Sequence, residues 1–257
     1  MIYAMSDIHG FADILQSNVE KLDLSGKNRL VLLGDYIDYG CESGQALRYI
    51  YALQKKYSSD KIIVLRGNHE DMFLEWLDTY NCANTDNTDE NSISAWNEWL
   101  KGDAEFNTVG TLITKEQLET LKELAHTVTE DILNIEAVKA ILLTSGELIE
   151  WLRSLPYYYE TENQIFVHAG IDEEAGEWWS LVTPNNIFTG KFPETKGLFY
   201  KDIIAGHIGT FGIAKDPNFH GVYYDCASHY YIDGTVNISG QIPVLVYDEE
   251  SGKYSEL

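Results

Sequence analysis

The chain has 257 residues, 44% of them apolar, and its 18 basic and 41 acidic residues give a formal net charge of -23. This length allows one large domain or two small ones with a sizeable buried core. The negative charge argues against nucleic acid and anionic membranes as partners, and a site for phosphate groups would need strong local positive charge, for which metal ions are the obvious source.

The N-terminal residues, the apolar runs and the cysteines indicate in which cellular compartment we expect the protein. Residues 1–9 lack the basic start and the long apolar stretch of a signal peptide. No apolar run approaches the roughly 18–20 residues needed to span a bilayer. The three cysteines, Cys41, Cys82 and Cys226, have unrelated spacings and form no CxxC motif. We therefore expect a reduced, cytoplasmic protein, and its oligomeric state stays open.

The first 70 residues alternate between predicted strands and predicted helices. Apolar runs predict strands at 1–6, 29–34 and 61–66. Between them, apolar residues spaced three and four apart predict helices at 11–22 and 43–57. Short connections between alternating strands and helices predict a parallel sheet with helices on its faces.

Strand signals disappear between residues 71 and 155. A polar loop is expected at 81–92, and Thr114-Lys-Glu-Gln117 is a plausible capping box at the start of a helix. The predicted helices of this region cover 72–80, 94–100, 114–125, 129–143 and 146–155. No Pro/Gly/Ser-rich linker or internal repeat sets the region apart. We therefore interpret residues from about 72 to 155 as a helical insertion within a single domain that spans 1–257, and its role as a lid, a partner surface or filler stays open.

Strand patterns return after residue 155. Apolar runs predict strands at 164–168 and 202–207. The Tyr/Val/Ile-rich segments 221–236 and 242–248, with their Gly turns, predict antiparallel strands that add a second sheet or an edge.

Five predicted strands end in side chains that are typical metal ligands. They are Asp7 and His9, Asp35 and Asp38, Asn68 and His69, His168, and His207. Sites in open α/β sheets form at the carboxyl ends of the strands, so we expect these residues to converge. Mixed imidazole and carboxylate ligands suit manganese, iron, zinc or nickel better than calcium or magnesium. The set is too large for one tetrahedral ion, and two divalent ions that share Asp35, on the middle strand, would use it economically.

The ordered motifs resemble a known family. They are Asp7-Ile-His9-Gly10, Gly34-Asp35-Tyr-Ile-Asp38-Tyr39-Gly40, Arg66-Gly-Asn68-His69-Glu70, His168-Ala-Gly and Gly206-His207. Together they are similar to the signature of the calcineurin-like metallophosphoesterases. The resemblance is closest to the phosphoprotein phosphatase (PPP) branch, which includes bacterial serine/threonine phosphatases and symmetrical dinucleoside tetraphosphatases. It implies an α/β fold, a four-layer α/β/β/α sandwich of two sheets between helices.

The resemblance also implies roles for the motif residues. Asp7, His9 and Asp35 would hold the first metal ion, and Asp35, Asn68, His168 and His207 the second, with manganese the first choice. A water bridging the two ions would attack phosphorus in line. By the same resemblance, His69 would act as general acid, and Asp38 would be the partner that raises its pKa. We expect Glu70 to anchor the loop around His69. An alternative for Asp38 is to cap the turn after Asp35.

One motif position departs from the family. Where the phosphatases have an arginine that clamps the substrate phosphate, this chain has Tyr39, whose hydroxyl gives one neutral hydrogen bond rather than a bidentate charged one. Candidates for substrate binding are therefore Tyr39, Arg66 and Lys201. Lys191 and Lys196 are further candidates, and by family analogy Arg66 is better placed to brace its loop.

We predict a metal-dependent phosphomonoester hydrolase of the serine/threonine phosphoprotein phosphatase type, acting on a phosphorylated protein or a small phosphoester. Two alternatives stay open. One is a hydrolase of dinucleoside tetraphosphates or other nucleotides, and the other is a metal-bound, non-catalytic module that binds phosphorylated partners.

Overall fold

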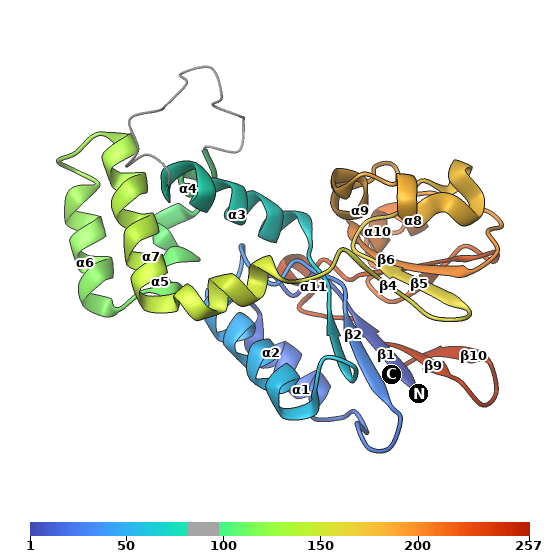
Figure 1. The fold of residues 1–257 in the computed structure, drawn as a ribbon. Helices are drawn as coiled ribbons and strands as arrows, with labels where there is room; N and C mark the ends of the chain where they lie inside the picture. Colours follow the sequence, from blue (N-terminus) through green and yellow to red (C-terminus); the bar gives the residue numbers. More distant parts are fainter. Residues whose placement is uncertain (82–97) are drawn as a thin grey trace.

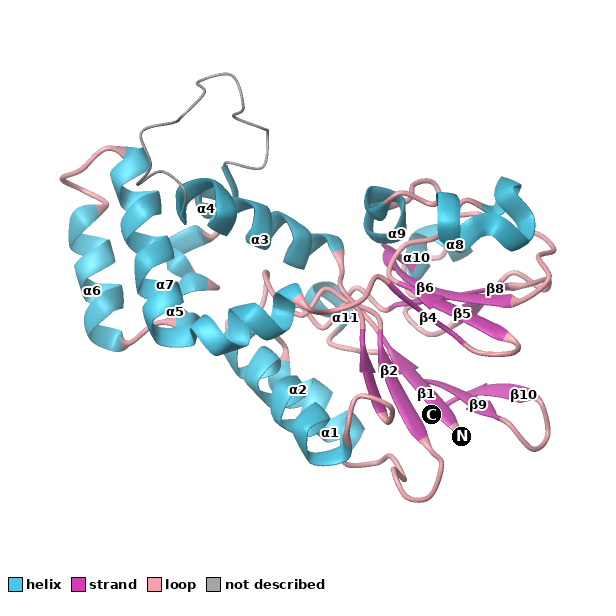
Figure 2. Ribbon diagram, in the orientation of Figure 1, coloured by secondary structure: helices cyan, strands magenta, loops and turns pink. Residues whose placement is uncertain are grey.

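The structure, a computed structural model, describes residues 1–81 and 98–257. Two five-stranded sheets lie face to face, with helices on the outer face of each, and a group of helices extends to one side (Figures 1 and 2). The predicted loop at 81–92, after its first residue, and the first part of the predicted helix at 94–100 lie outside the described residues.

The first sheet has the strand order β10-β9-β1-β2-β3. Its parallel part consists of β1 (Ile2–Met5), β2 (Arg29–Leu32) and β3 (Ile62–Val64), as the sequence predicts. The connecting helices α1 (Ala12–Val19) and α2 (Ser43–Tyr57) were also predicted. The antiparallel strands β9 (Leu245–Asp248) and β10 (Lys253–Glu256) complete its other edge.

The second sheet has the strand order β4-β5-β6-β8-β7. Its strands are β4 (Tyr158–Glu160), β5 (Gln164–Val167), β6 (Asp202–Gly209), β7 (Tyr223–Tyr224) and β8 (His229–Asp233). The predicted antiparallel pairing is present between β7 and β8, but β8 also runs parallel to β6, which the prediction did not include. The chain between them passes through α10 (Thr210–Ala214) and β7, and a crossover of this kind joins parallel strands, whereas a tight hairpin joins antiparallel ones.

Alternating side chains of the strands build the layers. Ile2 and Ala4 of β1 face the second sheet, where they meet Phe166 and Ile204. The neighbouring side chains of the same strands point outward to the helices of their own side. On the outer face of the second sheet these include α8 (Trp179–Val182) and α9 (Asn185–Gly190). Strands buried on both faces read as continuous apolar runs, and the predicted four-layer α/β/β/α arrangement is confirmed.

The predicted helical insertion follows β3 and precedes β4 in the chain. It contains α3 (Asn68–Asn81), α4 (Trp99–Gly102), the 3₁₀ turn η3 (Ala104–Phe106), α5 (Val109–Leu112), α6 (Lys115–Leu124) and α7 (Glu130–Arg153). The capping box at Thr114 and Gln117 is present. The two helices predicted at 129–143 and 146–155 form one element, α7, which bends at Ser145 (φ -122°), whose hydroxyl donates to the carbonyl of Leu112 (Figure 1).

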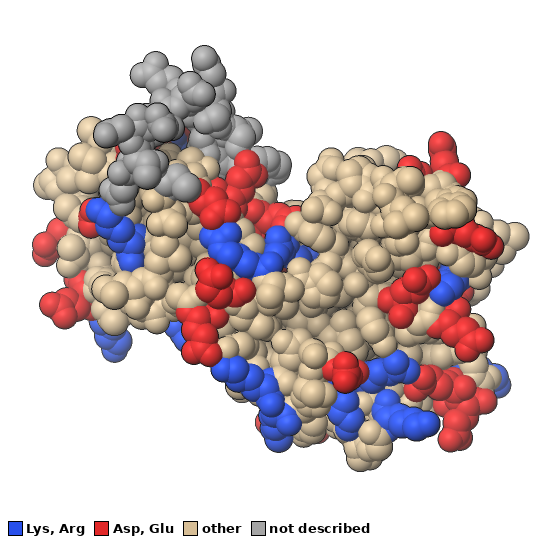
Figure 3. Space-filling model, viewed as in Figure 1, with Lys and Arg blue, Asp and Glu red and all other residues tan. Residues whose placement is uncertain are grey.

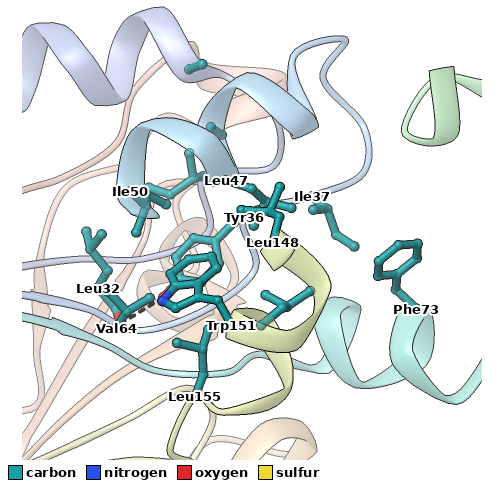
Figure 4. Close-up of a cluster of buried hydrophobic side chains, with 14 of the residues drawn as sticks. Leu32, Tyr36, Ile37, Leu47, Ile50, Val64, Phe73, Leu148, Trp151 and Leu155 are labelled. Atoms are coloured by element: carbon teal, nitrogen blue, oxygen red, sulfur yellow. Dashed lines mark hydrogen bonds between the residues drawn. The ribbon is translucent and has the colours of Figure 1, made fainter. Parts of the chain in front are cut away.

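The insertion and the first sheet share one apolar core. Leu32 and Val64 of the sheet, Leu47 and Ile50 of α2, and Trp151 of α7 pack together in this cluster (Figure 4). This continuity supports the predicted single domain. No described helix has the length and apolar character needed to cross a bilayer, and the cytoplasmic location stays a prediction.

Candidate active site

The polar residues at the strand ends lie along one edge, where the two sheets meet. The turns after β1 and β2 are joined by backbone hydrogen bonds, because Asp7 N donates to Gly34 O (3.1 Å) and His9 N donates to Asp35 O (2.9 Å). The second sheet reaches the same edge, since the amide of His207 donates to Asp7 Oδ2 (3.0 Å). Residues 200 positions apart are thereby brought into contact.

Several of these residues hold an unusual backbone conformation. The positive φ angles at this edge are 54° for Asp7, 46° for His9, 56° for Asp35, 71° for Asp38, 62° for Tyr39 and 65° for His207. Non-glycine residues seldom occupy this region, and each costs on the order of 1–3 kcal/mol unless the surroundings hold it in place. Half of the described non-glycine residues with positive φ lie at this edge, and such a concentration of strain indicates a functional region.

Glu70 holds the two central turns together. Its buried carboxylate accepts hydrogen bonds from the amides of Asp35 (2.8 Å), Tyr36 (2.7 Å) and Gly67 (3.0 Å). Burial and the charge of Asp35 raise the pKa of Glu70 to about 7, against the opposing effect of these donors. The contacts agree with the predicted anchoring of this loop. At Gly67 a Cβ atom would lie 2.2 Å from Asp35 Oδ1, so only glycine permits this approach.

The carboxylate of Asp35 is the centre of the group. Its Oδ2 lies 3.3 Å from His168 Nε2, 3.8 Å from His9 Nε2 and 3.9 Å from His69 Nε2. Burial alone would raise the pKa of Asp35, but the charges of His168 and His69 outweigh it and lower that pKa. A single carboxylate thus faces imidazoles from three separate segments, as a shared ligand would.

A second subset surrounds the amide of Asn68. Its side-chain oxygen lies 2.9 Å from His168 Nε2 and 3.0 Å from His207 Nδ1. Asn68 and His69 form the first turn of α3, so the helix begins earlier than the predicted 72–80 and both residues are fixed on it. Burial and the charge of His168 lower the pKa of His207 to about 4, which keeps that imidazole neutral and able to bind a cation.

The donor set fits two divalent cations. His9 Nδ1 lies 2.9 Å from the Ile37 carbonyl and His168 Nδ1 lies 3.2 Å from the Leu33 carbonyl, which directs the Nε2 atom of each ring toward Asp35. Metal-binding histidines are oriented in this way by backbone carbonyls. Potential ligand atoms converge in two groups that share Asp35, one with His9 and His69 and the other with His168 and His207. Asp7 lies 3.8 Å from His9 Nε2 and adds a carboxylate to the first group.

His69 and Asp38 form a close pair beside this centre. His69 Nδ1 lies 2.6 Å from Asp38 Oδ2. Burial lowers the pKa of His69, but the charge of Asp35 and the hydrogen bond to Asp38 raise it to about 9. The insertion holds Asp38 in turn, because Thr108 Oγ1 donates to Oδ1 (2.9 Å) and Trp99 Nε1 donates to Oδ2 (3.3 Å).

The candidate substrate-binding residues are dispersed. Tyr39 lies at the edge, 62% exposed, with its ring 4.7 Å from that of His9 and 5.4 Å from that of His69. Arg66 is directed away from the group, toward Asp71 (3.3 Å), the Tyr157 hydroxyl (3.2 Å) and the Arg153 carbonyl, so it braces the end of α7.

The structure does not bring Lys201 to the group. It precedes β6, whose far end carries His207, and its amine donates to Glu160 (2.9 Å) and to the Thr161 carbonyl (2.6 Å). Lys191 and Lys196 are paired with Glu173 (2.9 Å) and Glu194 (3.3 Å). Each of these cations has an acidic partner of its own, so none of the three supplies the charge that an arginine at Tyr39 would supply.

One buried carboxylate of this region was missed. Asp233 ends β8 and accepts from the amide of Thr235 (2.6 Å). Burial raises its pKa to about 6, and burial together with the charge of Asp233 raises the pKa of Asp7 well above its usual range. The signal was present, because the apolar run Tyr230-Tyr-Ile232 ends in Asp233 in the same way that the other strands end in ligands.

Known proteins are similar to this chain. The family model described as calcineurin-like phosphoesterase matches residues 1–229. A symmetrical bis(5'-nucleosyl)-tetraphosphatase of Pseudomonas fluorescens is 26% identical over 182 residues, which are 70% of this chain and 44% of that protein. The serine/threonine-protein phosphatase 4 catalytic subunit of Eremothecium gossypii is 38% identical over 64 residues, 25% of this chain and 20% of that protein.

A solved structure agrees in fold. The cold-active protein-tyrosine phosphatase of a psychrophilic Shewanella species superposes with a TM-score of 0.56 at 17% identity, covering 100% of this chain and 80% of that one. At this identity the likeness concerns the fold alone. The chain spans less than half the length of the first curated relatives, at 44% of each.

Proposed function

Because the chain belongs to the calcineurin-like phosphoesterases, we propose that it hydrolyses phosphomonoesters with the help of two divalent metal ions, with serine/threonine phosphoproteins as its substrate class. The observation that carries this proposal is the position of Asp35. Its carboxylate faces the rings of His9, His69 and His168, and the close His69–Asp38 pair lies beside it.

The residues divide into two groups by role. Asp7, His9 and Asp35 hold one ion, and Asp35 together with Asn68, His168 and His207 holds the other. Two ions at this position would supply the positive charge that a phosphate needs and would lower the pKa of a water molecule that acts as the nucleophile. Manganese is the first choice, with iron, zinc and nickel as the other metals that suit these ligands.

His69 supplies the proton for the leaving group. Its Nδ1 is held by Asp38, so its Nε2 is free to face the centre, where it lies 3.9 Å from Asp35 Oδ2. In the metal-free protein the charge of Asp35 and the hydrogen bond to Asp38 raise the pKa of His69 to about 9, and the contact with Asp38 still favours the protonated ring when the charge of Asp35 is used to bind cations. A protonated ring held in a single orientation is what a general acid requires.

The test is hydrolysis of p-nitrophenyl phosphate by the manganese-loaded protein, with a chelator-treated sample for comparison. We expect metal-dependent turnover of p-nitrophenyl phosphate in the wild type. The activity of His69→Asn is measured with phenyl phosphate, whose poorer leaving group depends on the acid, and we expect a large loss there with the metal content unchanged. The same substitution at the exposed His126 is the matched control. Activity that survives chelation would contradict the metal assignment, and full activity in His69→Asn would contradict the proton donor.

A nucleotide phosphohydrolase is the second candidate function. The tetraphosphatase named above aligns with 70% of this chain, whereas the serine/threonine phosphatase aligns with 25%. Diadenosine tetraphosphate belongs in the same assay, and a kcat/KM above that of every phosphomonoester would favour this candidate. The third alternative, a non-catalytic phospho-binding module, requires that the metal-loaded protein bind phosphomonoesters without any turnover.

A further inference from the structure

A cleft of about 810 Å³ opens beside the candidate active site. One wall comes from the edge where the two sheets meet, called the catalytic edge below, and contains Asp38, Tyr39 and His69. The opposite wall comes from the insertion, through Trp99 of α4 and the segment around η3. The cleft therefore lies between the catalytic edge and a region that the family motifs do not cover.

The cleft lies on the side of the leaving group. His69 Nε2 is directed toward Asp35, and the same ring forms part of the cleft wall. A phosphate placed at the ligand cluster, with its leaving oxygen next to His69, would therefore extend the rest of the substrate past His69 into this cleft. The lining of the cleft would therefore contact the leaving group, which is the part of the substrate that differs between phosphoesters.

The lining is acidic. Among the residues that the structure describes, four carboxylates line the cleft, those of Asp38, Glu98, Asp103 and Glu105, and no lysine or arginine does. Residues 82–97, which lie outside the description, contain no lysine or arginine in the sequence either. The surface around the insertion carries both signs of charge on the face that Figure 3 shows, so this one-sided lining differs from its surroundings.

Two of the four carboxylates have cationic partners. Asp38 is paired with His69 (2.6 Å), and Glu98 with Lys101 (3.0 Å), whose amine also binds Glu130 (2.8 Å). Asp103 instead accepts from the amides of Thr108 (2.6 Å) and Val109 (2.9 Å). With both ion pairs counted as neutral, Asp103 and Glu105 leave the cleft with excess negative charge, which favours cations and repels phosphate groups.

Aromatic rings complement these charges. Tyr39 is 62% exposed, and its ring forms part of the cleft lining. The indole of Trp99 is fixed by its hydrogen bond to Asp38 and by contacts with Phe73 and Trp76, each at 5.0 Å between ring centres. Aromatic faces attract ammonium and guanidinium groups, so the ring of Tyr39 and the acidic lining act in the same direction.

We propose that this cleft selects substrates whose leaving group is cationic, namely phosphopeptide segments with lysine or arginine beside the phosphorylated residue, and that it disfavours polyphosphate chains. This inference rests on the proposed phosphomonoesterase function and specifies its substrate class. It also assigns Glu105 and Asp103, which belong to none of the family motifs, to substrate selection.

The test compares two phosphoserine peptides of equal length, one flanked by lysines and the other by glutamates, with the manganese-loaded wild type. We expect kcat/KM to be about tenfold higher for the cationic peptide at low ionic strength. The preference should shrink in about 0.5 M salt because the charges are then screened. Diadenosine tetraphosphate, which carries a polyphosphate chain, should be a poorer substrate than the cationic peptide.

Variants connect the preference to the cleft. Glu105→Gln should lower the ratio of the two kcat/KM values by about threefold. Glu123→Gln removes the same charge from the exposed face of α6, outside the cleft, and should leave that ratio unchanged. An equal effect of both variants would show that net charge, and not the cleft, sets the preference.

Two further outcomes separate this inference from the proposed function. If p-nitrophenyl phosphate is hydrolysed but the glutamate peptide is processed as well as the lysine peptide or better, the inference on the cleft is wrong and the proposed function stands. If p-nitrophenyl phosphate is not hydrolysed, the proposed function is wrong. Fluorescence anisotropy of the labelled peptides with the chelator-treated wild type, whose cleft lining is intact, then decides on the cleft, because tighter binding of the cationic peptide supports it and equal or weaker binding refutes it.

Discussion

Replacing Asp38 by asparagine isolates the link between the proton donor and its partner. The substitution keeps the shape of the side chain and removes the charge that lies 2.6 Å from His69 Nδ1. In the wild type, the charge of Asp35 and the bond to Asp38 overcome burial and raise the pKa of His69 from 6.5 to about 9. We expect the pKa of His69 to fall toward its ordinary value in Asp38→Asn.

The size of the effect follows from these two pKa values. The difference between 6.5 and about 9 is 2.5 units, worth about 3.4 kcal/mol of preference for the protonated ring at 1.36 kcal/mol per unit. The charge of Asp35 is the largest single cause of the rise and stays in place, whereas the hydrogen bond and the charge of Asp38 are lost, so we expect Asp38→Asn to lower the pKa by roughly 1–2 units.

The assay is an NMR titration of the histidine rings in the chelator-treated protein, which needs no turnover. The folded state has the higher pKa, so the stability gained from protonating His69 is fully present below pH 6.5 and is lost as the pH rises through about 9. The urea midpoint of the wild type should therefore fall more over this interval than that of Asp38→Asn. In the metal-loaded enzyme, the variant should lose more activity toward phenyl phosphate than toward p-nitrophenyl phosphate, because the poorer leaving group depends more on the acid.

Thr108→Val is the matched control. It removes the hydrogen bond of 2.9 Å that Thr108 of the insertion donates to Asp38 Oδ1. The contact between Asp38 Oδ2 and His69 stays in place. The pKa of His69 should stay close to about 9 in this variant. An unchanged pKa in Asp38→Asn, or an equal fall in both variants, would refute the assigned pairing.

Three further measurements probe the centre, the cleft wall and the core. Asp35→Asn removes the carboxylate shared by the two ligand groups, so bound manganese, measured by elemental analysis, should fall for both ions, and retention of one full equivalent would count against sharing. The raised pKa of Asp103, about 6, means that its stabilising contribution is present below about pH 4 and lost as the pH rises through 6. Urea midpoints should therefore favour the wild type over Asp103→Asn more at pH 4.5 than at pH 7, and a pH-independent difference would contradict this sign. Trp76→Phe removes the bond from Nε1 to Asn134 Oδ1 (2.7 Å) in the buried core, so urea unfolding should show a loss of about 2–4 kcal/mol, and a loss below about 0.5 kcal/mol would mean that Asn134 finds another donor.

Features set by neighbouring residues could be predicted from the sequence. The helix over 43–57 follows from apolar residues spaced three and four apart, and the structure has α2 at Ser43–Tyr57. The capping box at Thr114 needs only two side chains three residues apart. The grouping of the candidate ligands was also predictable, because parallel strands end at the same edge and Asp7, Asp35 and His168 each lie within three residues of the end of a strand.

Features set by distant partners could not be predicted in this way. The bend of α7 depends on a bond from Ser145 to the Leu112 carbonyl, in another helix. Arg66 lies in a family motif, yet its guanidinium is held by Tyr157 and the Arg153 carbonyl, about a third of the chain away. Lys201 donates to Glu160 at the beginning of β6, whereas His207 lies near the other end of that strand. A salt bridge or a hydrogen bond can form with any residue that the fold brings near, so sequence spacing carries no information about it.

What the sequence by itself determined about this protein is the set of candidate ligands and most of the strands that present them, since both depend on short local patterns. Only the tertiary structure decided what surrounds them. It placed Trp99 and Thr108 of the insertion on Asp38 and put acidic side chains rather than lysines beside His69. The physical reason is that the insertion meets the catalytic edge through packing between segments far apart in the chain, and the charge of a cleft exists only once both of its walls are in place.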